Sequence, residues 1–294
     1  GMKNSFLQSR EWGKFQEAVG RRVEWMTIGG LEVQMVCVSL PFGLFYAQVS
    51  RVDLDEDGWR QVVERARKSG AVFVRIEPVK EREIKSEKQL KVRDLHPSTT
   101  RIIDLSLTEE ALLAQMKSKT RYNIGLAARK GVVVQEARGV WGIRKFLRLL
   151  EKTKERQQFT VHAPEYYEKM MAMDGARLFV ARYNGKVRTA NIIISHGDTA
   201  TYLHGASSEK DREVMAPYLL HWMTMLWAKK QGFRWYDFWG VAPEGVTDHP
   251  LASVSRFKEG FGGAVIEFPG TFEIPLRPVW YRLIRLHRRL RHVV

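Results

Sequence analysis

A lysine between two aromatic residues is the first candidate for chemistry in this sequence. Lys258 lies in the stretch 256–263 and is flanked by Phe257 and Phe261, on a short helix that we expect after an aromatic-rich strand at 233–238. Because clefts commonly form where a strand ends beside a loop, Lys258 could bring a positive charge into such a cleft. The simpler interpretation is a lysine on a solvated helix surface, where most lysines lie.

The order of expected elements in the second half of the chain would position this lysine. Helices at 141–156 and 165–173 precede a three-stranded meander, which is followed by a helix, a strand, the lysine helix and a last strand. This order resembles the N-acetyltransferase type of acyltransferase fold. Enzymes of that type carry a glycine-rich pyrophosphate loop after the third strand, but residues 207–212 contain no glycine. We therefore expect no acetyl-CoA and no other cofactor.

The first half of the chain also mixes helices with strands. Residues 9–19 have the apolar spacing of a short helix, and Gly29 and Gly30 separate two strand-like runs at 22–28 and 31–40. A helix at 57–69 and a buried type of strand at 71–77 follow. The sequence thus predicts a mixed α/β fold.

A basic helix is the second feature with possible chemistry. Ser106 and Glu109 have the spacing of a capping box, and the helix that they would open ends at Gly131. Its outer side carries Lys117, Lys119, Arg121, Arg129 and Lys130. This side is either a solvated face or a contact for nucleic-acid phosphates, because each bound cation releases counterions from the backbone.

Composition limits the classes of function. With 48 Lys and Arg against 33 Asp and Glu, the net charge of +15 favours an anionic partner, either nucleic acid, a phosphorylated substrate or an acidic membrane face. The single cysteine, Cys37, excludes an internal disulfide and a thiolate metal cage, so we expect no metal. No apolar window reaches the roughly 18 residues of a membrane-spanning helix, and no apolar signal-peptide core opens the sequence, so we expect a cytoplasmic protein.

The end of the chain is a basic amphipathic segment. Residues 278–294 contain no acidic residue and interleave Trp280, Leu283 and Leu286 with several arginines: Arg282, Arg285, Arg288, Arg289 and Arg291. A helix here would pack its apolar side on the first domain. Its arginines would still favour loose, salt-sensitive attachment to an anionic inner membrane face.

Six blocks of sequence make a family resemblance specific. They are residues 6–13 (FLQSREWG), 116–124 (MKSKTRYNI), 202–208 (YLHGASS), 216–222 (APYLLHW), 236–238 (YDF) and 256–262 (RFKEGFG). In this order they resemble the FemX/FemAB family, aminoacyl-tRNA-dependent transferases that add amino acids to the peptide of a peptidoglycan precursor. The resemblance runs from about residue 6 to residue 281. It implies two N-acetyltransferase-like domains that face a cleft, residues 1–137 and 138–271, with residues 272–294 packing back on the first.

The resemblance also implies a reaction, in which an amine of the muramyl peptide attacks the ester that joins an amino acid to tRNA. This ester is already activated, so the enzyme mainly aligns the reactants and stabilises a developing oxyanion. Lys258 would supply the positive charge near the carbonyl or the terminal tRNA phosphate. The backbone carbonyl of Phe257 would accept the proton of the amine, as proposed for the family.

Only some of the family's substrate-binding residues are preserved at the matching positions of this sequence. Lys14 and Tyr166 match a family lysine on the precursor phosphate and a substrate-binding tyrosine, whereas His162 and His204 stand where the family pattern has arginine and tyrosine. Trp239 replaces a common glycine. The remaining substrate positions implied by the resemblance are Tyr202, Tyr218 and Asp237. Residues 151–168 have neither the heptads nor the length for the coiled-coil arm of the FemA branch, so the chain is similar to the armless branch.

Two alternatives remain open at this point. The first is an idle basic module that binds RNA or anionic lipid through the helix at 117–130. The second is aminoacyl transfer from tRNA to a different amine, such as a lipid head group or a small metabolite. Under the main hypothesis the partners are aminoacyl-tRNA and a muramyl-peptide or lipid-linked precursor, and the protein is a monomer.

Overall fold

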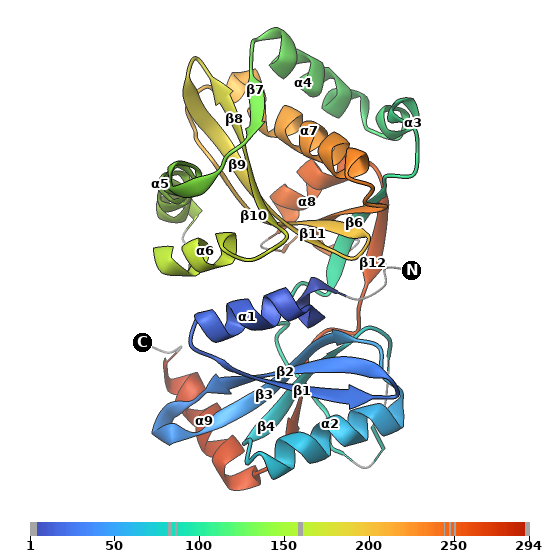
Figure 1. Ribbon diagram of the computed structural model, residues 1–294, viewed down its shortest axis with the longest axis vertical. Helices are drawn as coiled ribbons and strands as arrows, with labels where there is room; N and C mark the ends of the chain where they lie inside the picture. The colour runs from blue at the N-terminus through green and yellow to red at the C-terminus, as the bar shows by residue number, and fades with distance from the viewer. Residues whose placement is uncertain are drawn as a thin grey trace. The chain divides into compact units, whose positions relative to one another are not determined.

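The computed structural model describes residues 5–81, 84–85, 87–157, 161–243, 245–246, 248–249 and 251–291. The chain forms two compact units, one of Leu7–Ser98 with Phe268–Val294 and one of Thr99–Glu267 with Gly1–Phe6. Each unit contains its own sheet with covering helices (Figure 1).

This division does not coincide with the expected boundary at residue 137. Residues 99–137 supply two strands, β6 (Thr99–Asp104) and β7 (Val133–Glu136), to the sheet of the unit of Thr99–Glu267. There β6 pairs with β11 (Trp235–Gly240) and β12 (Ala264–Glu267), and β7 pairs with β8 (Ala176–Tyr183). A boundary read from the sequence groups segments that are neighbours along the chain. The strand β6 instead pairs with strands that lie more than 100 residues further along the chain.

The unit that contains Leu7–Ser98 has a six-stranded sheet in the order β1-β2-β3-β4-β13-β5. Its strands are β1 (Arg22–Ile28), β2 (Leu31–Ser39), β3 (Phe45–Val52), β4 (Phe73–Pro78), β5 (Leu90–Lys91) and β13 (Phe272–Pro275), and its helices are η1 (Phe6–Gln8), α1 (Arg10–Ala18), η2 (Pro41–Gly43), α2 (Glu56–Lys68) and α9 (Pro278–Arg291). The expected hairpin is confirmed, because β1 and β2 pair up to Ile28 and Leu31 around Gly29 and Gly30, which both have positive φ.

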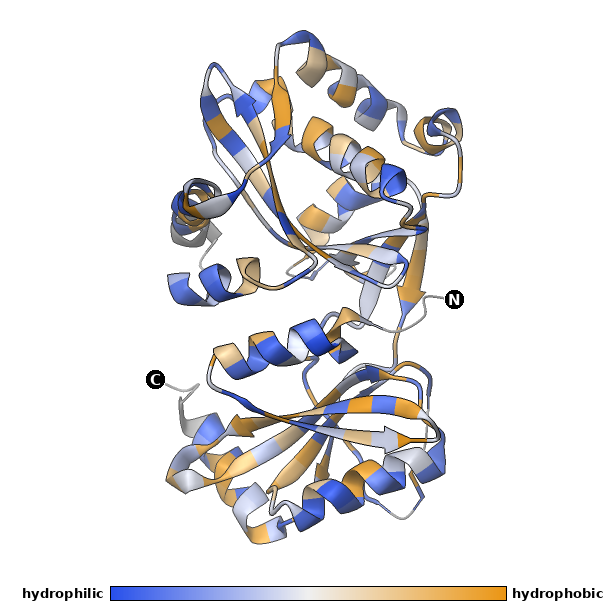
Figure 2. Ribbon diagram, viewed as in Figure 1, coloured by the Kyte–Doolittle hydropathy of each residue, from blue (hydrophilic) through white to orange (hydrophobic). Residues whose placement is uncertain are grey.

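Helix starts in this unit follow the capping rules. The Ser9 hydroxyl accepts the amide of Trp12 at 3.0 Å at the start of α1, and the Asp55 carboxylate accepts the amide of Gly58 at 2.8 Å at the start of α2. Figure 2 shows the alternation of hydrophobic and hydrophilic residues along α2. Its buried face, with Trp59, Val62 and Val63, packs on the sheet.

The C-terminal helix packs on this sheet through aromatic and ionic contacts. The Tyr281 ring lies 5.4 Å from the ring of Phe73, and its hydroxyl donates to Glu273 Oε2 at 2.8 Å. The carboxylate of Glu273 also pairs with Arg75 at 2.5 Å and with Arg288 at 3.4 Å. Because Glu273 is buried, these partners are needed to offset its desolvation.

The unit of Thr99–Glu267 has a seven-stranded sheet in the order β12-β6-β11-β10-β9-β8-β7. Its strands are β6 (Thr99–Asp104), β7 (Val133–Glu136), β8 (Ala176–Tyr183), β9 (Lys186–His196), β10 (Thr199–Ser207), β11 (Trp235–Gly240) and β12 (Ala264–Glu267). Its helices are α3 (Glu109–Ala114), α4 (Ser118–Arg129), α5 (Gly139–Gln157), α6 (Pro164–Met171), η3 (Arg212–Val214), α7 (Ala216–Lys230) and α8 (Ala252–Glu259). Figure 1 shows α4 and α7 on one side of this sheet and α5 on the other.

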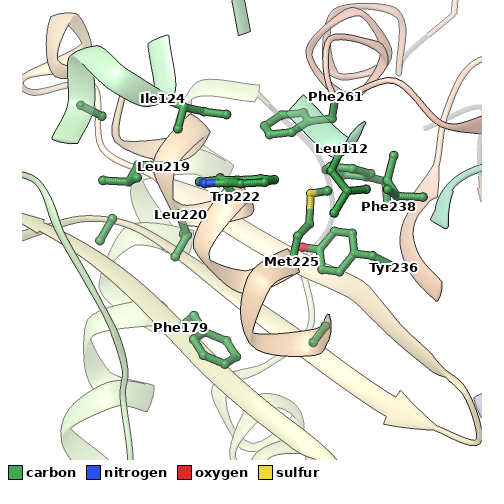
Figure 3. Packing of buried hydrophobic residues seen from close by; sticks show 14 of the residues in the cluster. Leu112, Ile124, Phe179, Leu219, Leu220, Trp222, Met225, Tyr236, Phe238 and Phe261 are labelled. Carbon is green, nitrogen blue, oxygen red and sulfur yellow. The ribbon is translucent and has the colours of Figure 1, made fainter. Parts of the chain in front are cut away.

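The core of this unit forms around α7. Leu220, Trp222 and Met225 meet Phe238 and Phe261 (Figure 3). Because these side chains come from the strands, from α7 and from the turn after α8, one apolar cluster fixes the elements that carry Lys258.

The single helix expected over 106–131 was wrong, because the structure contains two helices there. Ser106 donates its hydroxyl to Asp104 Oδ1 at 2.6 Å, and Thr108 is the residue that caps α3. The amide of Lys117 bonds to the Gly260 carbonyl at 2.9 Å, which ties the junction between α3 and α4 to the end of α8.

We predict that Tyr281→Phe lowers the free energy of unfolding by about 1–3 kcal/mol, because one oxygen of the buried Glu273 carboxylate loses its donor. Urea unfolding measures the change. The matched control is Arg282→Gln, an exposed position on α9, which should change stability by less than about 0.5 kcal/mol. Identical urea midpoints for Tyr281→Phe and the wild type would contradict the role of this hydrogen bond.

Candidate functional site

Lys258 is buried, with 5% of its surface exposed, near the end of α8. Its Nζ donates to the carbonyl of Gly240 at 2.6 Å. Burial lowers the pKa of Lys258 to about 8, and the Asp237 carboxylate opposes this shift by favouring the charged form. The interpretation as a solvated surface lysine is therefore wrong.

A bulge in β11 makes the Gly240 carbonyl available. Four residues of β11, Asp237 to Gly240, face three residues of β6, Ile102 to Thr100, so one residue is extra. Trp239 in this bulge has a left-handed φ of 61°. Asp237 Oδ1 accepts the amide of Trp239 at 2.7 Å and the hydroxyl of Thr100. The carboxylate thus holds the bulge and lies close enough to favour a charged Lys258.

A second bulge lies beside the first. The parallel strands β10 and β11 pair only from Thr199 with Trp235 to Thr201 with Asp237, and β10 then bulges against β9 between Tyr202 and His204. A Cβ atom at Gly205 would lie 2.0 Å from the Tyr202 hydroxyl, so glycine is required there to seat the ring. The two strands therefore stop pairing at the position where their side chains surround Lys258.

A buried hydrogen-bonded group of His221, Tyr236 and Asn191 lies near Lys258, and His221 was not a candidate in the sequence. The Tyr202 ring centre is 5.5 Å from Lys258 Nζ and 4.5 Å from the His221 ring. His221 Nδ1 lies 3.0 Å from the Tyr236 hydroxyl, and its Nε2 lies 3.3 Å from Asn191 Nδ2. Burial and the nearby charge of Lys258 lower the pKa of His221 to about 3. A neutral histidine then accepts from Asn191 and donates to Tyr236.

Aromatic rings cluster at Phe257 and Phe261, which lie near Lys258 in the sequence. Tyr218 lies 4.9 Å from Phe257 and 6.2 Å from Phe261, and the two phenylalanine rings lie 5.4 Å apart. The structure therefore brings together five predicted site residues: Lys258, Phe257, Tyr202, Tyr218 and Asp237.

A second group forms where α6 meets β10. His162 stacks on Tyr166 at 3.7 Å, and Tyr167 lies 5.3 Å from the ring of His204. Burial and neighbouring His162 lower the pKa of His204 to about 4. His204 Nε2 is buried without a hydrogen-bond partner among the described residues. Three predicted substrate residues, His162, Tyr166 and His204, thus surround Tyr167, which the sequence did not indicate.

The predicted basic face is exposed, but two of its members have structural roles. Lys117 pairs with Glu259 at 2.6 Å, and Arg121 donates to the carbonyls of Leu113 and Met116 at the end of α3. Arg129 lies 5.9 Å from the Tyr122 ring. Lys119 on α4 and Lys130 at its C-cap are exposed.

Lys14 does not belong to the compact unit that contains these groups. It is exposed on α1, which belongs to the other compact unit. Over the described residues there is no group of three or more His, Cys, Asp or Glu side chains that could hold a metal ion.

We predict that Asp237→Asn lowers the pKa of Lys258 below about 8. The asparagine oxygen can still accept from Trp239 and Thr100, but the attraction that favours the charged lysine is lost. Side-chain NMR of ¹³C-labelled lysine measures the pKa, and Lys258→Arg assigns the signal. Glu259→Gln is the control, because that carboxylate pairs with Lys117. A pKa of Lys258 that is equal in Asp237→Asn and the wild type would rule out the influence of Asp237.

The chain matches the model of the FemAB family over residues 86–192 and 173–289. It is 29% identical over 103 residues to aminoacyltransferase FemB of Staphylococcus epidermidis, covering 35% of this chain and 25% of FemB. It is 27% identical over 193 residues to UDP-N-acetylmuramoylpentapeptide-lysine N(6)-alanyltransferase of Weissella viridescens, covering 64% of this chain and 56% of that protein. The matches thus span a quarter to about half of the length of these relatives.

The crystal structure of FemX is similar to this structure, with a TM-score of 0.82 and 17% identity over 96% of this chain and 94% of that chain. The likeness confirms the expected fold class, mixed α/β with two N-acetyltransferase-like domains. Only six residues, 158–163, separate α5 from α6, which leaves no room for a long arm there. The family model covers more than half of the sequence, and the chain therefore belongs to the FemAB family.

Proposed function

We propose that this protein is an aminoacyltransferase that moves an amino acid from aminoacyl-tRNA to an amine of a peptidoglycan precursor peptide. The observation that carries the proposal is the buried Lys258, held by the Gly240 carbonyl where β10 and β11 stop pairing. Membership of the FemAB family and the activities of the two relatives support it.

In this reaction the acceptor amine attacks the ester carbonyl, so that a C–N bond forms and the C–O bond to the tRNA ribose breaks. The proton of the amine ends on the leaving ribose oxygen. A charged Lys258 would stabilise the developing oxyanion, because a cation in a desolvated site interacts more strongly than in water.

The Phe257 carbonyl is the proposed proton acceptor for the amine. It already accepts the amide of Gly260 at 3.2 Å, and a carbonyl oxygen has a second lone pair. A Cβ at position 260 would lie 2.2 Å from Thr120 Oγ1 and 3.1 Å from this carbonyl, so glycine keeps the oxygen open.

For the substrates we propose two separate sets of contacts. Lys14, His162, Tyr166 and His204 would hold the muramyl-peptide precursor, and the exposed cations of α4 would contact tRNA phosphates. We place the protein in the cytoplasm as a monomer, with salt-sensitive contact between the arginines of α9 and an anionic membrane face.

The direct test is incubation with a mixture of charged tRNAs and a muramyl-pentapeptide precursor, followed by mass spectrometry of the precursor. A mass increase of one amino-acid residue supports the proposal and identifies the amino acid. Binding of tRNA without any product would favour an idle basic module instead.

We predict that Lys258→Met reduces transfer by about 100-fold or more while the fold stays intact, because one charge is lost from a preorganised site. Circular dichroism checks the fold. Lys230→Met, at an exposed position of α7, is the control and should transfer normally.

The rate of transfer by the wild type should fall as the pH rises through about 8, since Lys258 then loses its proton. Transfer at the wild-type rate by Lys258→Met would reject the assignment.

We also predict that Lys14→Ala and Tyr166→Ala raise the KM for the precursor about tenfold and leave the KM for charged tRNA nearly unchanged, because each loses a polar contact with the acceptor. Steady-state kinetics with each substrate varied in turn separates the two effects. Lys68→Ala and Glu168→Ala are exposed controls in the same two units. A raised KM for tRNA alone would reverse the assignment of these residues.

A further inference from the structure

The C-terminal helix α9 has two apolar faces. Tyr281 and Ile284 are 4% and 2% exposed and pack inward. Val279, Leu283 and Leu286 are 70%, 50% and 56% exposed. Their spacing of four and three residues places them in one stripe on the opposite side of the helix. Packing of α9 on its own unit therefore leaves a second apolar stripe uncovered.

Positive charge borders this stripe. At about 100° per residue, Arg282 lies next to Leu286 on one edge of the stripe. Arg285 lies further round the helix on the same side, with its guanidinium 5.7 Å from the centre of the Tyr281 ring, and both arginines are exposed. No acidic residue occurs in α9. Glu273, an acidic residue of the sheet on which α9 packs, is buried and already binds Arg75, Arg288 and Tyr281.

A strained aromatic residue belongs to the same part of the unit. Phe42 in η2 is 80% exposed and has φ 63° and ψ 30°, a left-handed conformation that is unfavourable for a residue other than glycine. Pro41 and Gly43 flank it, and Leu40 and Leu44 anchor the loop on the core. Holding a phenylalanine outward at this cost indicates a role outside the fold.

Backbone hydrogen bonds place this loop beside the start of α9. The amide of Val72 donates to the Phe45 carbonyl at 2.9 Å, and the Val72 carbonyl accepts the amides of Leu276 and Arg277 at 3.0 Å each. Leu40, Leu44 and Trp280 also pack on one apolar cluster. The strand that follows η2 and the segment that leads into α9 therefore lie at the same end of the sheet, as can be followed in Figure 1.

We propose that these residues form a lipid-facing surface that inserts into an anionic bilayer. The surface consists of Phe42, Val279, Leu283 and Leu286, which would enter the lipid, and Arg282 and Arg285, which would contact lipid phosphates. An apolar stripe bordered by cations is typical of helices that lie in a membrane interface. The choice of an anionic leaflet rests on the proposed function, because a lipid-linked acceptor would be found there, but binding is measurable without catalysis.

Other occupants fit these observations less well. Two copies of the chain joined symmetrically through this surface would oppose arginine with arginine, and α9 offers no acidic residue to pair with them. RNA would satisfy the arginines but would leave the aliphatic stripe and Phe42 in water. A bilayer satisfies both chemistries.

The test is co-sedimentation of the full chain with vesicles of phosphatidylglycerol and phosphatidylcholine, at low and high salt. Two variants remove apolar contacts, Phe42→Asn, which tolerates the left-handed backbone, and the double change Leu283→Gln with Leu286→Gln. Each should weaken binding about tenfold or more at both salt concentrations. Arg282→Gln with Arg285→Gln should weaken binding about tenfold, mainly at low salt. Met223→Gln, an exposed apolar position in the other unit, is the control and should bind like the wild type.

Insertion is tested by an environment-sensitive fluorophore on Leu283→Cys, since Cys37 is buried and does not compete for the label. A blue shift on vesicles, absent for a label on Met223→Cys, supports the proposal. Wild-type affinity of both apolar variants overturns it in favour of purely electrostatic attachment. Two further outcomes would also overturn it. One is a dimer of the wild type that the double change Leu283→Gln with Leu286→Gln abolishes. The other is RNA that displaces the protein from vesicles and that the apolar variants bind as tightly as the wild type does. Transfer to a soluble precursor without vesicle binding would refute this inference alone, and vesicle binding without transfer would refute the proposed function alone.

Discussion

The hydrogen bond from Lys258 to the Gly240 carbonyl is the interaction on which the candidate site depends. A buried ammonium group without a partner would be strongly unfavourable, so the lysine can occupy this position only if a backbone acceptor leaves the regular ladder of β11. Asp237 makes this possible by holding the bulge at Trp239, and its charge also favours the charged lysine. One carboxylate therefore controls both the geometry and the electrostatics of the lysine.

Two histidines in the unit of Thr99–Glu267, His204 and His221, show how burial adapts an ionisable side chain to its surroundings. His221 cannot accept a proton readily beside Lys258, so it acts as a neutral bridge between Asn191 and Tyr236. His204 is also kept neutral above about pH 4, but its buried Nε2 has no partner among the described residues. The first histidine thus supports the fold around the lysine, while the second still has a hydrogen bond to offer to a bound molecule.

The sequence predicted the elements around Lys258 because local patterns determine them, and the family blocks pointed to Phe257, Tyr202, Tyr218 and Asp237, which the structure brings together. It could not predict the Gly240 acceptor, because a bulge depends on the register between two strands that are far apart in the chain. His221 was missed because one histidine in an apolar helix has no distinctive spacing. Arg121 and Lys117 were expected on a basic face that is either solvated or in contact with nucleic-acid phosphates. Their bonds to the end of α3 and to Glu259 were not expected, since these depend on the break before α4.

The path of the chain has a consequence for biogenesis. β13 lies between β4 and β5, and the side chains of Thr271 and Glu273 bind Glu77 and Arg75 of β4. During synthesis the ribosome therefore makes all of Thr99–Glu267 before the strand that completes the earlier sheet. Until β13 emerges, β4 has an unpaired edge, and such edges promote association between chains. The nascent protein could then complete its middle unit before the sheet that its earliest strands begin.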